Sequence, residues 1–267
     1  FKTNYQEGKT MKPLLENWIK HIEEELENYK SSFEVKDELT PEVWENNQLK
    51  PEVLQVLREI AQDFFEGLDL GQTEIRDIIL TGSLANYNWS EYSDIDLHVL
   101  VDFAQIDENT SLVKDFFDAK KSVWNSKHDI MVMGYEVEIY VQDINEPHMA
   151  TGQYSVMNDG WIVEPNKVDP VIDWNSIKLK YDSLQDQIDR VAEIYNNGDH
   201  QQSHEAAISL QDRLRKFRKA GLETGGEFSV ENLTFKTLRR SGSIGELIDI
   251  KHKSYDAMMS LDSPLPV

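Results

Sequence analysis

Apolar residues recur at helical spacing in two stretches near the start of the chain. Side chains three or four residues apart fall on one face of a helix, where they can pack against the rest of the protein. The first stretch comprises Met11, Leu14, Leu15, Trp18, Ile19, Ile22 and Leu26, and the second comprises Val53, Leu57, Ile60, Ala61, Phe64 and Phe65. Proline is favoured in the first turn of a helix, so we expect the second helix to begin near Pro51. The pattern also predicts an amphipathic helix over residues 108–125.

After the second helix the pattern becomes that of β-strands. The runs IRDIILTGS and SDIDLHVLVDF, at residues 75–83 and 93–103, are rich in β-branched and aliphatic residues. The run HDIMVMGYEVEIYVQD has two strand-like halves around Met133-Gly134, and the runs QYSVM and WIVEP flank residues 158–160, which read Asn-Asp-Gly. Both interruptions are typical of hairpin turns. The sequence therefore predicts two hairpins in addition to the first pair of strands.

Helical spacing returns from about residue 176 and continues almost to the end of the chain. The last helix is predicted to start at Ser243, because Ser243 and Glu246 form a capping-box pattern. We predict the α+β class, with a mixed β-sheet that is flanked by helices and followed by a helical domain. The predicted parts are an N-terminal helical segment (residues 1–50), a sheet domain (residues 51–172) and a C-terminal helical domain (residues 173–267).

The chain carries 49 acidic and 27 basic residues, a formal net charge of −22. A charge of this sign works against broad, sequence-independent attraction to a nucleic-acid backbone or to an anionic membrane. The acidity is concentrated before residue 176, where 35 acidic residues accompany 14 basic ones. The chain has no cysteine, no signal-peptide pattern and no apolar run of the roughly 18 to 20 residues that span a membrane. We therefore expect a soluble, cytoplasmic protein without a membrane partner.

Two aspartates interrupt the apolar run SDIDLHVLVDF. Because side chains alternate across a strand, Asp94, Asp96 and His98 share one face, and the apolar residues between them share the other. Burying a carboxylate without a partner is expensive, so some partner must stand opposite the pair. Carboxylates two residues apart can share divalent cations, and Mg²⁺ is the natural choice for oxygen ligands. The sequence therefore predicts an Mg²⁺ site, for which Mn²⁺ is an alternative ion.

A third carboxylate is predicted from the run YEVEIYVQD at residues 135–143. The same alternation places Glu136 and Glu138 on one face of this strand. If the strand lies beside the Asp94 strand, one of the two glutamates completes the metal site. We choose Glu138, because it sits deeper in the apolar run, where an unpaired charge is harder to tolerate.

These motifs resemble the signature of the nucleotidyltransferase superfamily, whose fold is shared by DNA polymerase beta, the antibiotic nucleotidyltransferases and the minimal nucleotidyltransferases. The signature is Gly-Ser after an apolar residue, a spacer of about ten residues, an Asp-apolar-Asp-apolar motif, and a later acidic residue between apolar ones. In this chain the three parts are Gly82-Ser83, Asp94-Ile95-Asp96-Leu97 and Val137-Glu138-Ile139. The resemblance covers residues 75–142 and implies a nucleotidyltransferase-like mixed sheet.

The resemblance also implies a role for each residue of the motifs. Asp94 and Asp96 would bridge two Mg²⁺ ions, and Glu138 would complete the catalytic site at the attacking hydroxyl. Gly82 would allow the backbone to approach the triphosphate closely, and Ser83 would hydrogen-bond its phosphate oxygens. The chain would then move a nucleoside monophosphate from a nucleoside triphosphate to an acceptor hydroxyl, with release of pyrophosphate.

The loop after the Gly-Ser pair departs from the minimal members of the superfamily, in which it often reads Ala-Arg-Gly. Here residues 85–87 read Ala-Asn-Tyr, so the loop has no basic residue for the phosphates. We expect the positive charge to come from the helical half, where the runs RLRKFRKAG and FKTLRRSG contain Arg213, Lys216 and Arg239. Basic clusters of this kind are equally typical of a solvated helix face, where they interact favourably with the helix dipole.

Histidines and aromatic residues near these motifs are expected to have structural roles. None of the histidines lies in a recognisable zinc motif, and aromatic residues in such a loop commonly anchor it to the fold rather than stack on a base. The residues concerned are His98, His148, His200 and His204, and Tyr87, Trp89 and Tyr92.

The sequence leaves the acceptor open. A long nucleic-acid acceptor needs several phosphate contacts, and a net charge of −22 opposes each of them. We therefore rank a small molecule, a nucleotide or a protein hydroxyl ahead of RNA. One alternative is a catalytically silent protein of the same fold that acts as an interaction or antitoxin-like module. An alarmone synthetase is a remoter alternative, whose motifs the chain does not show.

Overall fold

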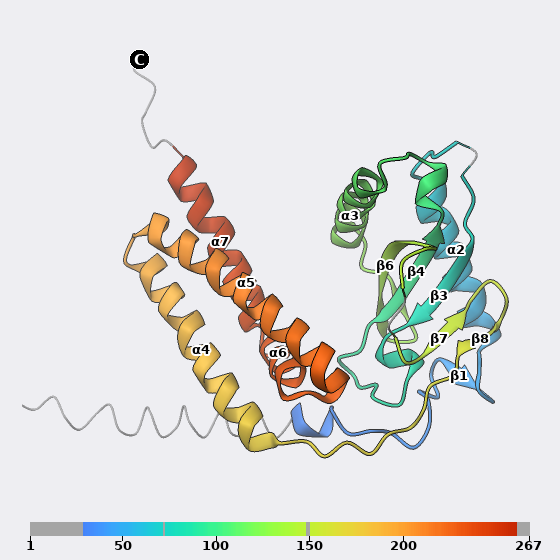
Figure 1. Cartoon of the computed structure of the whole chain (residues 1–267), viewed down its shortest axis with the longest axis horizontal. Coiled ribbons are helices and arrows are strands. Elements are labelled where there is room, and N and C mark those ends of the chain that lie inside the picture. Colours follow the sequence, from blue (N-terminus) through green and yellow to red (C-terminus); the bar gives the residue numbers. More distant parts are fainter. Residues whose placement is uncertain (1–28, 72, 148–149, 261–267) are drawn as a thin grey trace, which may run out of the picture. The chain divides into compact units, whose positions relative to one another are not determined.

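The computed structural model shows two compact units (Figure 1). We call Lys30–Asp169 the sheet unit, and the described residues from Pro170 onward the helical unit. The structure describes residues 29–71, 73–147 and 150–260.

The division between the units lies close to the predicted domain boundary at residues 172 and 173. Residues 30–50 group with the sheet and not with a separate N-terminal helical segment, which the sequence predicts for residues 1–50. The helix predicted over residues 11–26 lies outside the described residues.

The sheet unit contains one six-stranded mixed sheet, in the spatial order β5-β6-β4-β3-β7-β8. Strands β4 and β6 run parallel, whereas the other neighbouring strands are antiparallel. The predicted α+β class with a mixed sheet is therefore confirmed. The strands are β3 (Asp77–Thr81), β4 (Ile95–Val101), β5 (Met131–Val132), β6 (Tyr135–Asp143), β7 (Gln153–Ser155) and β8 (Gly160–Val163).

Both predicted hairpins are present in the sheet. Met133 and Gly134 join β5 to β6 with φ angles of +52° and +88°. Asp159 has a φ of +51° in the turn between β7 and β8. Positive φ angles give a turn the twist that matches antiparallel strands, which explains the glycine and aspartate at these positions.

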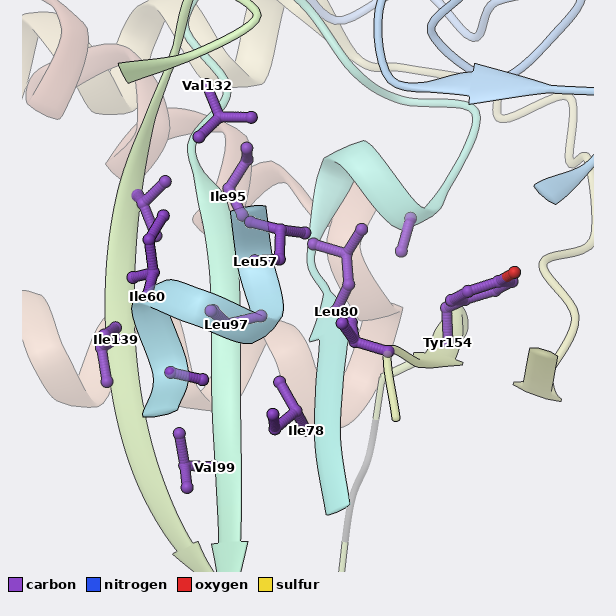
Figure 2. Packing of buried hydrophobic residues seen from close by; sticks show 14 of the residues in the cluster. Leu57, Ile60, Ile78, Leu80, Ile95, Leu97, Val99, Val132, Ile139 and Tyr154 are labelled. Atoms are coloured by element: carbon purple, nitrogen blue, oxygen red, sulfur yellow. The ribbon is translucent and has the colours of Figure 1, made fainter. Parts of the chain in front are cut away.

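The apolar core of the sheet unit lies between the sheet and helix α2 (Pro51–Glu66), which begins at the predicted proline. Figure 2 shows Leu57 and Ile60 of α2 among the apolar side chains of the strands. In β4 the alternate residues Ile95, Leu97, Val99 and Val101 are fully buried. Helix α3 (Thr110–Lys127) adds Val113 and Phe117 to the same core. The apolar face of β4 is thereby used for packing, which leaves its acidic face for chemistry.

Trp44 attaches residues 30–50 to the sheet. This residue belongs to the two-residue strand β1 (Trp44–Glu45), which pairs with β2 (Gln48–Leu49). Its ring stacks on Trp161 of β8, with centroids 4.7 Å apart, and meets the edge of Tyr154. Its indole N–H donates a 2.7 Å hydrogen bond to the carbonyl of Leu84, in the 3₁₀ turn η1 (Ser83–Ala85). Trp44 therefore also holds the loop that follows the Gly-Ser pair.

The helical unit consists of packed helices around a separate apolar core, which includes Leu210, Leu214, Leu238 and Leu247. Aspartate or serine side chains cap three of these helices at their N-termini, as expected for residues that can accept from free N–H groups. The helices are α4 (Trp174–Asn196), α5 (His200–Gly225), α6 (Val230–Arg240) and α7 (Ser243–Met259).

Helix α7 begins at Ser243, as predicted, but the capping box predicted there is wrong. The residue that caps this helix is Gly242, with a left-handed φ of 82°, and no side chain caps the helix. Ser243 is already inside the first turn, and its hydroxyl donates a 2.6 Å hydrogen bond to Gln185 of α4. The left-handed glycine joins α6 directly to α7, so Ser243 turns inward and packs between helices instead of accepting from the backbone.

Among the described residues, no helix combines the length and apolar character needed to cross a membrane.

Candidate metal centre

Three carboxylates meet on the acidic face of β4 and β6. The parallel pairing sets Asp96 directly beside Glu138, and Asp94 lies immediately before β4. One oxygen of each carboxylate lies within 4.8 Å of the others. All three side chains are partly buried, whereas Glu136, two residues earlier on β6, is exposed. The structure thus brings together the three carboxylates chosen from the sequence, in an arrangement that could hold a metal ion.

Gly82 lies against this cluster at the end of β3. Thr81, the last residue of β3, pairs with Asp96, so the next residue passes close to the Asp96 carboxylate. Gly82 has φ 78° and ψ −160°, a combination that is open only to glycine. A Cβ atom at this position would lie 1.9 Å from Oδ2 of Asp96, far inside van der Waals contact. Glycine is therefore required here both by the backbone conformation and by the neighbouring carboxylate.

Ser83 is connected to the residue that precedes Asp94. Its hydroxyl donates a 2.8 Å hydrogen bond to Oγ of Ser93, which also accepts from the backbone N–H of Ser90 at 3.0 Å. The two ends of the loop between β3 and β4 are thereby held together beside the carboxylates. Ser83 remains partly exposed, so a ligand can reach it.

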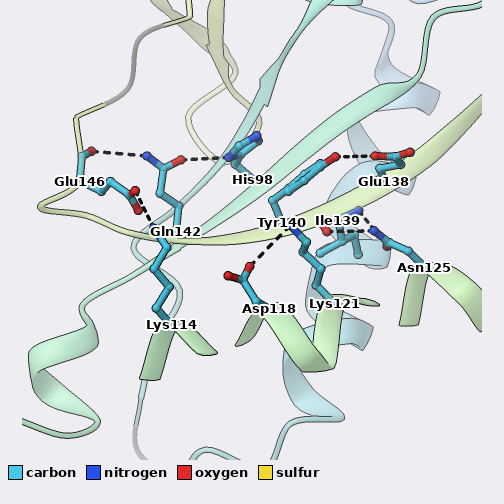
Figure 3. Close-up of polar contacts among 10 residues, drawn as sticks. All are labelled: His98, Lys114, Asp118, Lys121, Asn125, Glu138, Ile139, Tyr140, Gln142 and Glu146. Atoms are coloured by element: carbon cyan, nitrogen blue, oxygen red, sulfur yellow. Dashed lines mark hydrogen bonds and ion pairs between the residues drawn. The ribbon is translucent and has the colours of Figure 1, made fainter. Parts of the chain in front are cut away.

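Glu138 has a hydrogen-bonding partner on its own strand (Figure 3). The hydroxyl of Tyr140 donates to Oε2 of Glu138. Burial raises the pKa of Tyr140 far above its ordinary value, and the hydrogen bond to Glu138 and the charges of Asp96 and Asp94 add to this effect. The phenol is therefore a protonated donor at neutral pH. Strand alternation in the sequence places Tyr140 on the same face as Glu138, but it gave no indication of this hydrogen bond.

His98 lies next to this tyrosine and is not part of the carboxylate cluster. Its ring stacks on Tyr140, with centroids 4.9 Å apart and an angle of 18° between the planes. Its Nδ1 lies 2.9 Å from Oε1 of Gln142 (Figure 3). These contacts agree with the structural role that we expected for His98.

Lys121 is a cation beside Tyr140 that the sequence did not indicate. It extends from α3, and its Nζ atom lies 4.2 Å from the centroid of the Tyr140 ring. It also forms a 3.5 Å ion pair with Asp118 of the same helix. Only the packing of α3 against β6 brings this lysine toward the acidic face, so no motif in the sequence could have revealed it.

The aromatic residues of the loop between β3 and β4 act mainly as anchors, as expected. The indole N–H of Trp89 donates to the carbonyl of Glu38 at 2.9 Å, and the partly buried side chains of Tyr87 and Trp89 pack against the apolar core. Tyr92 differs from them, because 43% of its side chain is exposed. The loop is thereby attached to the segment before β1.

The remaining histidines do not form a metal site among the described residues. His200 lies in the first turn of α5, beside the ring of Tyr195. His204 points its Nδ1 toward the carbonyl of Lys251, 2.9 Å away. His148 lies outside the described residues.

Arg213, Lys216 and Arg239, which we call the helical-unit cations, are exposed on α5 and α6. Neighbouring basic residues are engaged within the helical unit. Arg218, for example, donates to Asn232 at 3.2 Å and lies over the ring of Phe235. The helical-unit cations and the carboxylates belong to different compact units. Their predicted role in holding the triphosphate therefore stays a prediction.

Comparisons with known proteins do not assign this chain. No protein-family model matches it, and neither the curated proteins nor the solved structures include a significant match. Arguments about function therefore rest on the geometry of the carboxylates and on the motifs around them.

Proposed function

We propose that this protein is an Mg²⁺-dependent nucleotidyltransferase. The observation that carries the proposal is the cluster of Asp94, Asp96 and Glu138, whose carboxylate oxygens lie within 4.8 Å of one another. Asp96 and Glu138 lie on adjacent parallel strands, and Gly82 lies beside Asp96. The three motifs that resemble the nucleotidyltransferase signature therefore meet at one place in the sheet unit. The mixed sheet flanked by helices supports the nucleotidyltransferase-like fold that the sequence resembles.

The donor set fits Mg²⁺ or Mn²⁺. Three carboxylates supply hard oxygen ligands, and a partly exposed site leaves room for water and phosphate oxygens as the remaining ligands. A metal ion bound by these residues would stabilise the negative charge on the attacking and leaving oxygens of the transfer. The short distance between the Gly82 backbone and the Asp96 carboxylate supports this interpretation, because any side chain at position 82 would displace Asp96.

In the proposed reaction, Gly82 and Ser83 hold the triphosphate beside the carboxylates. The oxygen of the acceptor hydroxyl forms a bond to the α-phosphorus, and the bond from this phosphorus to the oxygen that bridges to the β-phosphate breaks. Pyrophosphate leaves with the electron pair of that bond, and the hydroxyl proton passes to Glu138. No nucleophilic side chain is needed, because positioning and charge stabilisation dominate this chemistry.

The acceptor that we propose is a small molecule, a nucleotide or a protein hydroxyl rather than RNA. The net charge of −22 opposes the several phosphate contacts that a long nucleic acid requires. The labelled product is therefore expected to resist nucleases. Labelling of an RNA 3′ end, removed by nuclease, would overturn this ranking but not the proposed reaction.

The test uses purified protein, each labelled nucleoside triphosphate in turn, Mg²⁺ and a mixed cell extract that supplies acceptors. Asp94→Asn and Asp96→Asn keep the shape of each side chain but remove its charge, and we expect both to abolish labelling. Glu138→Gln should behave in the same way. Glu136→Gln is the matched control, because Glu136 lies two residues away on the same strand and is exposed.

The outcomes separate the proposal from its alternatives. Labelling by a folded Asp94→Asn/Asp96→Asn variant at the wild-type rate would rule out the proposed mechanism. Wild-type protein that binds Mn²⁺ and yet transfers no nucleotide to any fraction of the extract would favour the catalytically silent interaction module instead.

A further inference from the structure

Tyr140 contacts the carboxylate cluster without belonging to it. It lies two residues after Glu138 on β6, so the two side chains share one face of the sheet. Its hydroxyl donates to Oε2 of Glu138, as Figure 3 shows. A carboxylate has two oxygens, and this hydrogen bond engages one of them. The other oxygen is left for a metal ion or for the proton of an acceptor.

Neighbouring side chains fix the ring of Tyr140. His98, on the adjacent strand β4, stacks on it at a centroid distance of 4.9 Å. Gln142 in turn holds His98, through the 2.9 Å contact between its Oε1 and Nδ1 of the imidazole. Lys121 approaches the same ring to 4.2 Å, and its ion pair with Asp118 restrains it. Tyr140 is therefore a rigid donor whose direction is set by residues of β4, β6 and α3.

We propose that Tyr140 is a positioning residue, which orients the Glu138 carboxylate so that Glu138 offers a single oxygen to the metal centre. This inference rests on the proposed function, because it gives Tyr140 a part in the same site. Residues that hydrogen-bond to metal ligands fix the orientation of those ligands, and their loss typically weakens metal binding by about 10- to 100-fold. The alternative is that Tyr140 only satisfies its own buried hydroxyl, in which case metal binding does not depend on it.

Tyr140→Phe distinguishes these alternatives, because it removes the hydroxyl and keeps the stacked ring. Tyr154→Phe is the matched control. Tyr154 is likewise in the sheet unit, where it is fully buried, and its hydroxyl donates a 2.6 Å hydrogen bond to the carboxylate of Asp159. Both variants therefore lose one hydrogen bond between a tyrosine and a carboxylate. Only the hydrogen bond lost in Tyr140→Phe involves a carboxylate of the metal centre.

The measurement is the dissociation constant for Mn²⁺, obtained from the electron paramagnetic resonance signal of the free ion, with thermal unfolding recorded for each variant. We expect Tyr140→Phe to raise this constant by about tenfold. Tyr154→Phe should leave this dissociation constant unchanged, while its melting temperature shifts by about as much as that of Tyr140→Phe. A purely structural role for Tyr140 would move only the melting temperature.

Two results would overturn the inference, and they can be told apart. Wild-type Mn²⁺ affinity in Tyr140→Phe, together with weakened affinity in Glu138→Gln, would remove the role of Tyr140 and leave the metal centre standing. Failure of the wild-type protein to bind Mn²⁺ would refute the metal centre, and the role of Tyr140 with it.

A second measurement does not depend on the folding of Tyr140→Phe. Addition of Mg²⁺ to the wild-type protein should perturb the near-ultraviolet absorption of tyrosine, because the phenol of Tyr140 is hydrogen-bonded to Glu138, the proposed metal ligand. The same change is expected in Tyr154→Phe. A wild-type spectrum that does not respond to saturating Mg²⁺ would also overturn the inference.

Discussion

Replacement of Gly82 by alanine should disable the metal centre while leaving the sheet unit folded. The added Cβ would lie 1.9 Å from Oδ2 of Asp96, whereas ordinary contact begins at 3.4 Å. The carboxylate would therefore have to retreat by about 1.5 Å, or β3 would have to move away from β4. A displacement of about 1 Å in a catalytic group can reduce a rate by about 100-fold. We expect a loss of nucleotidyl transfer of at least that size.

The backbone of Gly82 adds a cost in stability. Alanine at φ 78° and ψ −160° is strained by about 1–3 kcal/mol. A loss of stability caused by backbone strain must be separated from the effect of the added Cβ on Asp96. The control must therefore carry alanine at another positive φ angle, where the Cβ meets nothing. Gly134→Ala provides it, because Gly134 has a φ of +88° and nothing lies within 4 Å of its added Cβ.

The assays are thermal unfolding, Mn²⁺ affinity and transfer of labelled nucleotide for both glycine variants. Both should unfold at a lower temperature than the wild type, but only Gly82→Ala should lose Mn²⁺ affinity and transfer. If Gly82→Ala keeps wild-type Mn²⁺ affinity, and its loss of stability equals that of Gly134→Ala, then Gly82 serves only the turn. The close approach to Asp96 would then have no part in metal binding.

Two further predictions concern the core and the source of positive charge. Leu97→Ala, at a fully buried position of β4, should lower the free energy of unfolding of the sheet unit by about 2–5 kcal/mol in a denaturant titration. Leu112→Ala, at an exposed position of α3, should change it by less than about 0.5 kcal/mol. Removing the charges of the helical-unit cations should weaken binding of a nucleoside triphosphate, by about tenfold for each charge-assisted hydrogen bond that is lost. Unchanged affinity in that variant, with a loss in Lys121→Met, would place the cation source in the sheet unit.

The carboxylates were predictable because strand alternation decides which side chains share a face. Asp94 and Asp96 could be placed on one face from the sequence alone, since their apolar neighbours had to be buried. The position of Glu138 beside Asp96 needed one further condition, that β6 lie next to β4. The sequence motif indicated this neighbourhood, but only the observed register shows that Asp96 pairs with Glu138.

The partners of these carboxylates could not be predicted in the same way. Lys121 reaches Tyr140 because α3 packs against β6, and the position of a helix on a sheet depends on the whole core. The misassigned cap at Ser243 has a related cause. The local pattern correctly predicted a helix start at Ser243, but it could not show that Gly242 would be the capping residue or that the Ser243 hydroxyl would bond to Gln185 of another helix.

The carboxylate cluster is better explained by a ligand than by folding. Ionised Asp94, Asp96 and Glu138 repel one another when their oxygens lie within 4.8 Å, and amides at the same positions would keep the backbone pairing without that repulsion. Gly82 occupies a conformation that is open to glycine but would strain any other residue. Both features meet at Asp96, which pairs with Glu138 on one side and leaves no room for a side chain at Gly82 on the other. We therefore infer that a cation bound by the three carboxylates would offset their mutual repulsion.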